Sequence, residues 1–563
     1  MHRLLLGVLV TVLFLPPPVH GAAGARCLRA SGGAAARCLA DYTATVVHCR
    51  RRADSTCETD ARAESGTLAA VLARPEASDR RACADADADA LGYLSADVVV
   101  LRTRNACGDY GEDLLALTYP GEPGSLSGAF LGCQRVAAAQ LARLRAATVQ
   151  RFGPGCYLRE WQGHRCARAG RDQKVARARA AAERAIVRRC GARLATVGLA
   201  PLAPVLDRTV THARHYAQQV YPPNDLGSTA EFGPFPVGIR TLMLDDPARL
   251  NVAGTGPRPV TVEVYYPSTA VAVAGVPRDV VTVLGVEVVV TPSYRDVVIA
   301  AGPHPLVVFS HGNNGIRIQS FFFAAHLASH GFVVVSPDHH GNTFVDTLLG
   351  VVDPEVATNR PRDLSFVIDR FLAFGEEAGN FFAGAIDPAR IGASGHSFGG
   401  FTVLALAGGT SPLGTFTDAR VQAVLSQAPA TTAYPDAYFQ TIHVPTLLVG
   451  GSLDETTPFA GEQQRPFDLL PAGAAVVALA QVRDAGHFTF SDFCEVDRQL
   501  LGFLGGFDEA CEPRHLPWRH AHDIVNYLSL NFFDAVLNGN VEALARLAPA
   551  AVGGIEDLTV QRK

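Results

Sequence analysis

The chain has 563 residues, a formal net charge of −5 at pH 7 and a hydrophobic share of 48%. This length predicts more than one domain, each large enough to bury a core. The small net charge argues against a strongly basic nucleic-acid-binding protein, so no nucleic-acid partner is expected.

Residues 1–21 have the pattern of a secretory signal peptide. His2 and Arg3 form a short basic region, Leu4 to Leu15 form an apolar core, and small residues suited to cleavage follow. The apolar core is too short to span a bilayer, and an uncleaved anchor is the alternative. No later segment reaches transmembrane length, so we expect an exported protein, secreted or periplasmic, with no transmembrane anchor after signal removal.

Residues 22–195 are predicted to form a small, mainly helical domain held together by disulfides. The chain has twelve cysteines, ten of them within 27–190, and lacks the C-x-x-C pairs typical of metal sites. Apolar residues at helical spacing predict helices over 135–150 and 172–195. Sequence alone leaves the pairing of the ten cysteines open. The arginines clustered in 159–193 are interpreted as a solvated helix face, and binding of an acidic surface is the less favoured alternative.

Residues 196–227 are predicted to be a linker and residues 228–540 an α/β domain, followed by a tail at 541–563. Apolar strand patterns alternate with helical patterns, which indicates a mostly parallel sheet flanked by helices. The stretch Val260–Tyr266 alternates as an edge strand does. Further strands are expected at 280–291, 305–310, 331–335, 391–394, 421–425, 446–449 and 476–482, with helices at 321–329, 363–372 and 520–537.

The segment Gly395-His396-Ser397-Phe398-Gly399 follows an apolar strand and precedes helix-forming residues. The pattern G-x-S-x-G predicts a nucleophile elbow, a sharp strand-to-helix turn that exposes the serine hydroxyl. The alternative is an ordinary glycine-rich loop, because five-residue patterns also occur by chance. The strand before and the helix after favour Ser397 as a catalytic nucleophile.

A serine nucleophile needs a base and a carboxylate that orients the base, in the chain order serine, acid, histidine. The acid candidate is Asp454, which ends a glycine-containing loop after the strand 446–449. A simple turn aspartate is the alternative role, and Glu455 is the nearest competitor. The base candidate is His487, which follows the last strand of the sheet.

The oxyanion of an acyl-transfer reaction needs two preorganised backbone N–H donors. One is expected from Phe398, the residue after the nucleophile, and the other from Asn313, in the loop after the strand that ends at Ser310. A plain strand exit is the alternative for this loop. His311 is expected to brace the loop rather than to react.

The adjacent His339 and His340 invite interpretation as a metal site. No H-E-x-x-H or Cys/His framework accompanies them, so a structural role in a loop is favoured. No metal and no cofactor are therefore expected.

Cys494 and Cys511 flank a 16-residue segment just past His487. In an exported protein we expect them to form a structural disulfide that fixes the chain leaving the histidine loop, with free thiols as the alternative. Such a closure contributes about 3 kcal/mol in the chain-entropy model.

Several motifs occur in order along a little over half of the chain. They are Pro236–Thr241, Leu306–Gly312, Leu327–Val334, Arg360–Val367, and Asp387–Gly392 leading into Gly395–Gly400. With these motifs, residues from about 234 to 537 resemble the bacterial dienelactone hydrolase-like esterases and the platelet-activating factor acetylhydrolase family. The cysteine-rich region lies outside this resemblance.

The resemblance implies an α/β-hydrolase fold and a cofactor-free serine esterase mechanism acting on carboxylic esters. It assigns the nucleophile to Ser397, the base to His487 and the oxyanion donors to Asn313 and Phe398. The wider group places its acid after either of two strands. Residues 426–429, after the earlier of these strands, include no carboxylate, which favours Asp454.

The sequence thus predicts a secreted serine esterase that forms an acyl-enzyme on a small-molecule or lipid ester. A phospholipase of the platelet-activating factor acetylhydrolase type, a lipase, a polyester hydrolase, or an amidase or peptidase with the same triad are the enzymatic alternatives. A non-catalytic extracellular binding or adhesion protein that uses its cysteine-rich domain is the alternative of another class. The oligomeric state stays open.

Overall fold

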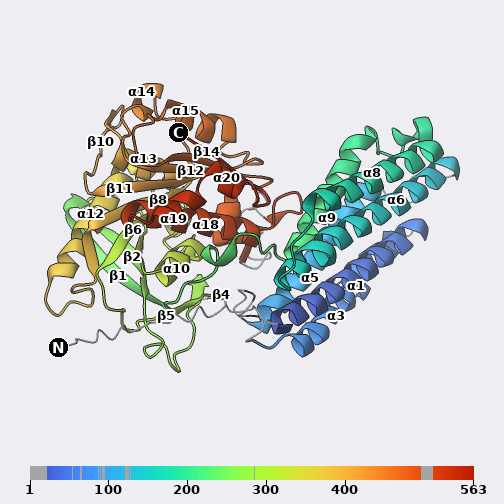
Figure 1. Ribbon diagram of the computed structural model, residues 1–563, viewed down its shortest axis with the longest axis horizontal. Coiled ribbons are helices and arrows are strands. Elements are labelled where there is room, and N and C mark those ends of the chain that lie inside the picture. The colour runs from blue at the N-terminus through green and yellow to red at the C-terminus, as the bar shows by residue number, and fades with distance from the viewer. Residues whose placement is uncertain are drawn as a thin grey trace, which may run out of the picture.

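The computed structural model describes residues 22–52, 55–63, 66–85, 88, 91, 95–120, 126, 128–283, 286–495 and 511–563. The predicted signal peptide, residues 1–21, lies outside the described residues. Figure 1 shows long helices lying side by side at one end of the molecule, and a sheet with its covering helices at the other. We call the described residues of 22–220 the helical unit, and those of 237–563 the α/β unit.

The helical unit confirms the predicted cysteine-rich helical fold. The helices predicted over 135–150 and 172–195 are the longer α6 and the slightly shifted α8, whose buried residues face each other in one apolar cluster. The helices of the unit are α1 (Ala22–Arg52), α2 (Ser55–Arg62), α3 (Thr67–Ala82), α5 (Ala96–Thr118), α6 (Gly128–Phe152), α7 (Leu158–Trp161), α8 (Arg168–Cys190) and α9 (Leu202–Val220).

Disulfides cross-link the helices and loops of this unit, and the sequence predicted their presence without their pairing. Because the unit has few large apolar side chains, covalent links between helices supply part of what a larger core would otherwise provide. The pairs are Cys27–Cys83, Cys38–Cys107, Cys49–Cys57, Cys133–Cys190 and Cys156–Cys166.

The prediction of a linker over 196–227 was wrong for most of that segment, because it contains α9. Pro204 does not interrupt this helix, because it lies in the first turn of α9, where its missing N–H would have no acceptor within the helix. Buried residues of α9, such as Leu206 and Tyr216, pack against α5 and α6. The helix is therefore part of the helical unit.

The α/β unit contains a ten-stranded, mostly parallel sheet, which confirms the predicted fold class. Strands β7, β6, β8, β11, β12 and β13 are parallel, while β2 pairs antiparallel with β7 and β1, and β14 antiparallel with β13. In sheet order the strands are β14 (Leu558–Arg562), β13 (Val477–Val482), β12 (Thr446–Gly451), β11 (Val421–Gln427), β8 (Ile386–His396), β6 (His304–Ser310), β7 (Val333–Pro337), β2 (Pro257–Pro267), β1 (Val237–Leu250) and β5 (Ser293–Arg295).

Helices cover both faces of this sheet, because alternate strand residues point to opposite sides. In β6, Val307 and Phe309 pack on the side of α10 (Phe321–Ser329) and α18 (Trp518–Leu537). Leu306 and Val308 pack on the side of α12 (Val356–Glu376) and α13 (Phe398–Ala407). All four residues are buried, as expected of a strand covered on both faces. None of the described helices combines the length and apolarity that a membrane span requires.

Two expectations about strands were wrong. The stretch Val260–Tyr266 was expected at an edge, but β2 lies between β7 and β1. Its polar Glu263 is buried, and it accepts hydrogen bonds from Thr241 and Arg317. The alternation of polar and apolar residues in β2 therefore reflects polar partners inside the protein and not contact with solvent. The run at 280–291 forms a separate hairpin of β3 (Val280–Val283) and β4 (Val286–Val290).

The predicted tail, residues 541–563, is also part of the fold. It forms α19 (Val541–Arg546), α20 (Pro549–Val552) and β14, and β14 covers the outer edge of β13. An uncovered edge would leave backbone N–H and C=O groups of β13 unpaired. The last strand therefore completes the sheet.

Candidate active site

Ser397 lies at the turn between β8 and α13, with φ 58° and ψ −119°. A positive φ is strained for a residue other than glycine and is maintained only by its surroundings. One support is the hydrogen bond from Ser397 N to the carbonyl of Gln427, 2.9 Å. The chain is so tight here that a Cβ on Gly399 would lie 1.8 Å from the carbonyl oxygen of Ser310, and one on Gly395 would lie 2.4 Å from that of Gly399. The turn has the geometry predicted for a nucleophile elbow.

Replacing Gly399 by alanine is expected to lower the free energy of unfolding by about 1–3 kcal/mol, because the new methyl group would have to displace backbone. Urea unfolding followed by circular dichroism measures this loss. Gly461→Ala is the matched control, since a Cβ there meets nothing within 4 Å. Equal stability of the two variants would contradict the tight approach of α13 to β6.

The structure brings Ser397, His487 and Asp454 into one hydrogen-bonded chain. His487 Nε2 lies 2.9 Å from Ser397 Oγ, and His487 Nδ1 lies 2.9 Å from Asp454 Oδ2. Asp454 follows β12 and His487 follows β13, so the carboxyl ends of neighbouring parallel strands carry both groups. The imidazole of His487 and the carboxylate of Asp454 are buried, while Ser397 is half-buried. The serine is therefore the member of the three that is most accessible from solvent.

Thr457, which the sequence analysis did not single out, holds the Asp454 side chain in place. Its backbone N–H donates to Asp454 Oδ1 over 2.6 Å, and its hydroxyl lies 2.7 Å from Asp454 Oδ2. The same hydroxyl lies 3.1 Å from His487 Nδ1. An aspartate whose side chain accepts from a backbone N–H a few residues further on is a common local turn, and that spacing was a usable signal.

His396, which occupies the first x position of the G-x-S-x-G pattern, forms a hydrogen bond with the backbone of His487. Burial lowers the pKa of His396 well below its usual value, so its ring is neutral. The ring then donates from Nε2 to the carbonyl of His487, 3.0 Å away, and accepts at Nδ1 from Gln319, 2.8 Å away. Gln319 Oε1 in turn accepts from Gly312 N, 2.9 Å. These contacts join the histidine loop to the loop after β6.

The two predicted oxyanion donors, Phe398 and Asn313, belong to segments that adjoin Ser397. Phe398 is the first residue of α13, where backbone N–H groups lack intrahelical acceptors. Asn313 follows Gly312, whose Cβ would lie only 3.5 Å from Ser397 Cβ. Asn313 Oδ1 accepts a hydrogen bond of 2.8 Å from Asn342 Nδ2. The loop after β6 is thus adjacent to the serine and anchored from behind.

Arg360 is the buried cation behind that loop. Its guanidinium donates to Asn342 Oδ1 (2.6 Å), to the carbonyl of Gly312 (3.4 Å) and to the carbonyl of His311, and it lies 4.7 Å from the centre of the Phe398 ring. Burial lowers the pKa of Arg360 to about 9, which still leaves it charged at neutral pH. The carbonyl of Gly312 and the N–H of Asn313 belong to one peptide, so this charge polarises the predicted donor. The sequence offered no signal for it beyond the family motif.

His339 and His340 both make hydrogen bonds within the α/β unit. His339 Nδ1 lies 2.9 Å from Asp363 Oδ2 and its Nε2 2.8 Å from Ser310 Oγ, which repeats the order acid, histidine, serine. All three side chains have no exposed area, so no substrate reaches Ser310. Burial lowers the pKa of His339 to about 3 and keeps it neutral. His340 Nε2 accepts a hydrogen bond from Val252 N.

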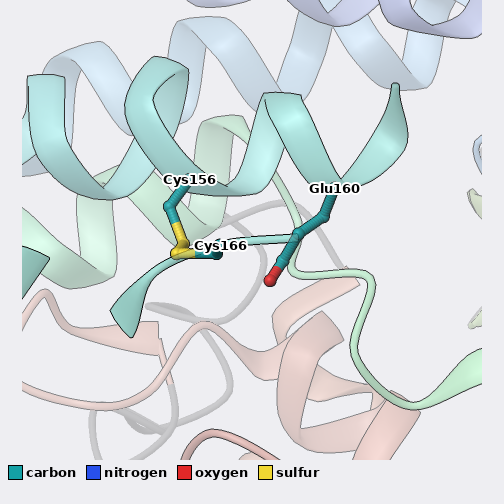
Figure 2. A group of neighbouring side chains, drawn as sticks. All are labelled: Cys156, Glu160 and Cys166. Carbon is teal, nitrogen blue, oxygen red and sulfur yellow. A yellow bond between two sulfur atoms is a disulfide. The ribbon is translucent and has the colours of Figure 1, made fainter. Parts of the chain in front are cut away.

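One group among the described residues has the side chain types of a metal site. It lies in the helical unit, more than 200 residues before Ser397 in the sequence. Ligand atoms of Cys156, Glu160 and Cys166 lie within 4.8 Å of one another. The two sulfur atoms are bonded to each other, as Figure 2 shows, so neither offers a thiolate. A single carboxylate remains, and this does not make a metal site.

Cys494 and Cys511 form a disulfide in the structure. Cys494 lies in a short 3-10 helix, Asp492–Glu495, directly after the one that begins at His487. The bond therefore connects the end of the histidine loop to the chain that leads into α18.

Two family models match the C-terminal part of the chain. The PET hydrolase-like model matches residues 300–496, and the model of platelet-activating factor acetylhydrolase, isoform II, matches residues 227–358. The C-terminal part of this chain has the α/β-hydrolase fold. The resemblance to esterases inferred from the motifs is confirmed, and the helical unit precedes both matches in this chain.

Individual proteins similar to the C-terminal part are named as cutinases and as a ferulic acid esterase. Cutinase est1 of Thermobifida alba is 28% identical over 182 residues, which cover 32% of this chain and 53% of the cutinase. Cutinase 2 of Thermobifida cellulosilytica is 28% identical over 182 residues, 32% of this chain and 60% of that protein. The chain thus spans between half and two thirds of the length of these relatives. The solved ferulic acid esterase of Streptomyces cinnamoneus has 24% identity and a TM-score of 0.44, covering 58% of this chain and 96% of that chain.

Proposed function

We propose that this α/β-hydrolase is a serine esterase that cleaves carboxylic esters through an acyl-enzyme. Ser397 is the nucleophile, His487 the general base and acid, and Asp454 the carboxylate that orients the imidazole. The single observation that supports this assignment most is the hydrogen-bonded chain from Ser397 Oγ through His487 to Asp454, with 2.9 Å at each contact. Matches to PET hydrolase-like proteins and cutinases support the same reaction class.

In the first step the Ser397 hydroxyl attacks the ester carbonyl while His487 Nε2 takes its proton. Asp454 stays ionised and stabilises the imidazolium through Nδ1–H. The tetrahedral oxyanion lies between the backbone N–H groups of Asn313 and Phe398. The alcohol then leaves with the proton from His487. Water activated by the same imidazole attacks the acyl-enzyme, releases the acid and restores Ser397.

The ester class is the open part of this proposal. The cutinase and PET hydrolase-like matches favour a polyester, while the acetylhydrolase match favours a phospholipid ester. All of these substrates present a carboxylic ester carbonyl, which is the group the proposed chemistry needs. The disulfides support action outside the cytoplasm, in keeping with the predicted signal peptide.

A fluorophosphonate probe tests the proposal against the binding-protein alternative. The native protein is expected to be labelled at Ser397, as identified by peptide mapping, because only a serine activated by a base reacts readily. Heat-denatured protein and Ser397→Ala are the controls, and both are expected to stay unlabelled. A folded protein that resists the probe would favour a binding module. A panel of esters and amides of varied acyl length then separates an esterase from an amidase.

A further inference from the structure

The helical unit contacts the loop that carries His487 through side chains of α9, among them Arg214. Arg214, on α9, donates from one terminal nitrogen to Asp484 Oδ2 over 2.5 Å and from the other to Asp557 Oδ1 over 3.0 Å. Its side chain is only 10% exposed, so these charge-assisted contacts are well shielded from water. Asp484 lies three residues before His487.

The neighbouring His215 adds a second contact from α9. Burial lowers the pKa of His215, so the ring is neutral. Its Nδ1 donates to the carbonyl of Pro513, 3.0 Å away, and its Nε2 lies 3.1 Å from a terminal nitrogen of Arg214 and 3.3 Å from Asp484 Oδ2. The positive charge that balances Asp484 is therefore that of Arg214. Burial opposes the ionised form of Asp484, but its contacts with His215 and Arg214 outweigh this and lower its pKa.

Asp484 has a backbone conformation that needs such support. Its φ is 61°, in the left-handed region that non-glycine residues rarely adopt. Its N–H donates to Ser452 Oγ (2.8 Å) and its carbonyl accepts from Leu516 N (2.7 Å). The next residue, Ala485, accepts at its carbonyl from Leu453 N (2.9 Å). The turn at Asp484 thus connects the loop of His487 to the loop of Asp454.

The other carboxylate that Arg214 binds anchors the same turn from the last strand. Asp557 precedes β14, and its carbonyl accepts from Arg483 N over 2.8 Å. Its side chain has no exposed area and also accepts from Gln218, on α9, over 2.6 Å. Arg214 therefore holds together two turns, at the end of β13 and at the start of β14, that define where the histidine loop begins.

We propose that Arg214 is a positioning residue for the reaction, and that through Asp484 it fixes the loop bearing His487, which makes the helical unit part of the active-site support. This inference rests on the proposed function. Proton transfer needs His487 Nε2 within hydrogen-bond reach of Ser397 Oγ, and a displacement of about 1 Å lowers turnover by up to about 10²-fold. Without the guanidinium, Asp484 loses the charge that holds its strained turn.

The test is steady-state hydrolysis of a short, soluble nitrophenyl ester by the full-length protein. Arg214→Gln is expected to lower kcat by about 10- to 100-fold, with KM changed less than about threefold, because the reacting geometry changes and the substrate contacts do not. Arg214→Lys, which keeps the cation, is expected to recover part of the loss. The rate of fluorophosphonate labelling is expected to fall in parallel with kcat.

Arg171→Gln is the matched control. Arg171 is equally buried, lies in the helical unit and pairs with Glu556 of the α/β unit over 2.7 Å, but it does not contact the turn at Asp484. We expect this variant to lose stability in thermal unfolding and to keep kcat. An equal loss of kcat in Arg171→Gln and Arg214→Gln would overturn the specific role of Arg214.

A double-mutant cycle with Asp484→Asn tests the route of the effect. If Arg214 acts through Asp484, the double variant has the same kcat as the less active of the two single variants. A loss of kcat in the double variant equal to the product of the two single losses would overturn this route. Asp484→Asn alone carries the test should Arg214→Gln not fold, and a kcat within twofold of wild type would then overturn the proposal. A wild-type protein that neither reacts with the probe nor cleaves esters contradicts the proposed function instead, so the two failures are distinguishable.

Discussion

Replacing Ser397 by alanine is expected to lower turnover of a short nitrophenyl ester by about 10⁶-fold. The hydroxyl is the only group of the protein that bonds to the acyl carbon in the proposed reaction, and removing the nucleophile of a serine hydrolase leaves only binding and oxyanion stabilisation. The side chain of Ser397 is half-buried, and its hydroxyl is hydrogen-bonded to His487, so the fold should be retained. Steady-state kinetics with purified protein measures the loss.

Ser411→Ala serves as the matched control for this variant. Ser411 is a buried serine on the short strand β9 (Thr410–Ser411), where its hydroxyl bonds only to neighbouring residues. Its replacement is expected to leave turnover unchanged. A Ser397→Ala protein that retains more than a tenth of wild-type activity would show that another group performs the attack.

The second large effect is expected from Asp454→Asn, which should lower kcat by about 10⁴-fold. The amide is nearly isosteric, but it presents a donor where His487 Nδ1–H needs an acceptor, so the imidazole loses its correct tautomer and the imidazolium loses its counter-charge. Substrate binding does not involve this carboxylate, so KM is expected to change little. The kcat and KM of the same nitrophenyl ester measure both effects.

Glu455→Gln is the control that separates the two adjacent carboxylates. Glu455 is exposed and pairs with Arg514 over 2.7 Å, whereas Asp454 is buried and contacts His487. We expect Glu455→Gln to stay within about twofold of wild-type turnover. Should Glu455→Gln be the inactive variant and Asp454→Asn the active one, the acid would have been assigned to the wrong residue.

The proposed triad was predictable because its signals are local. Gly395 and Gly399 must be glycine, because a Cβ at either position would lie closer than 2.5 Å to a backbone oxygen. The requirement for glycine two residues before and two residues after the serine is therefore visible in the sequence as a short motif. Asp454 and His487 were placed by the strands that precede them, since parallel strands carry their carboxyl ends to one edge of the sheet. Chain order then left few competitors.

The supporting residues were not predictable in the same way. Gln319 acts on His396 from 77 residues away, and Thr457 acts on His487 from 30 residues away. Arg360 has no periodic or spacing signature, and its role depends on its burial beneath the loop after β6. Such contacts exist only once loops of different strands have met.

By itself, the sequence determined the helices and most strands, the order of the reactive groups and the presence of disulfides. These follow from apolar periodicity, from glycine at tight turns and from cysteine content, all of which act within a few residues. Only the tertiary structure decided the cysteine pairing, the interior place of β2, the addition of β14 to the sheet and the contact of α9 with Asp484. Each of these depends on which surfaces meet after the chain has closed long loops, and no local pattern encodes that choice.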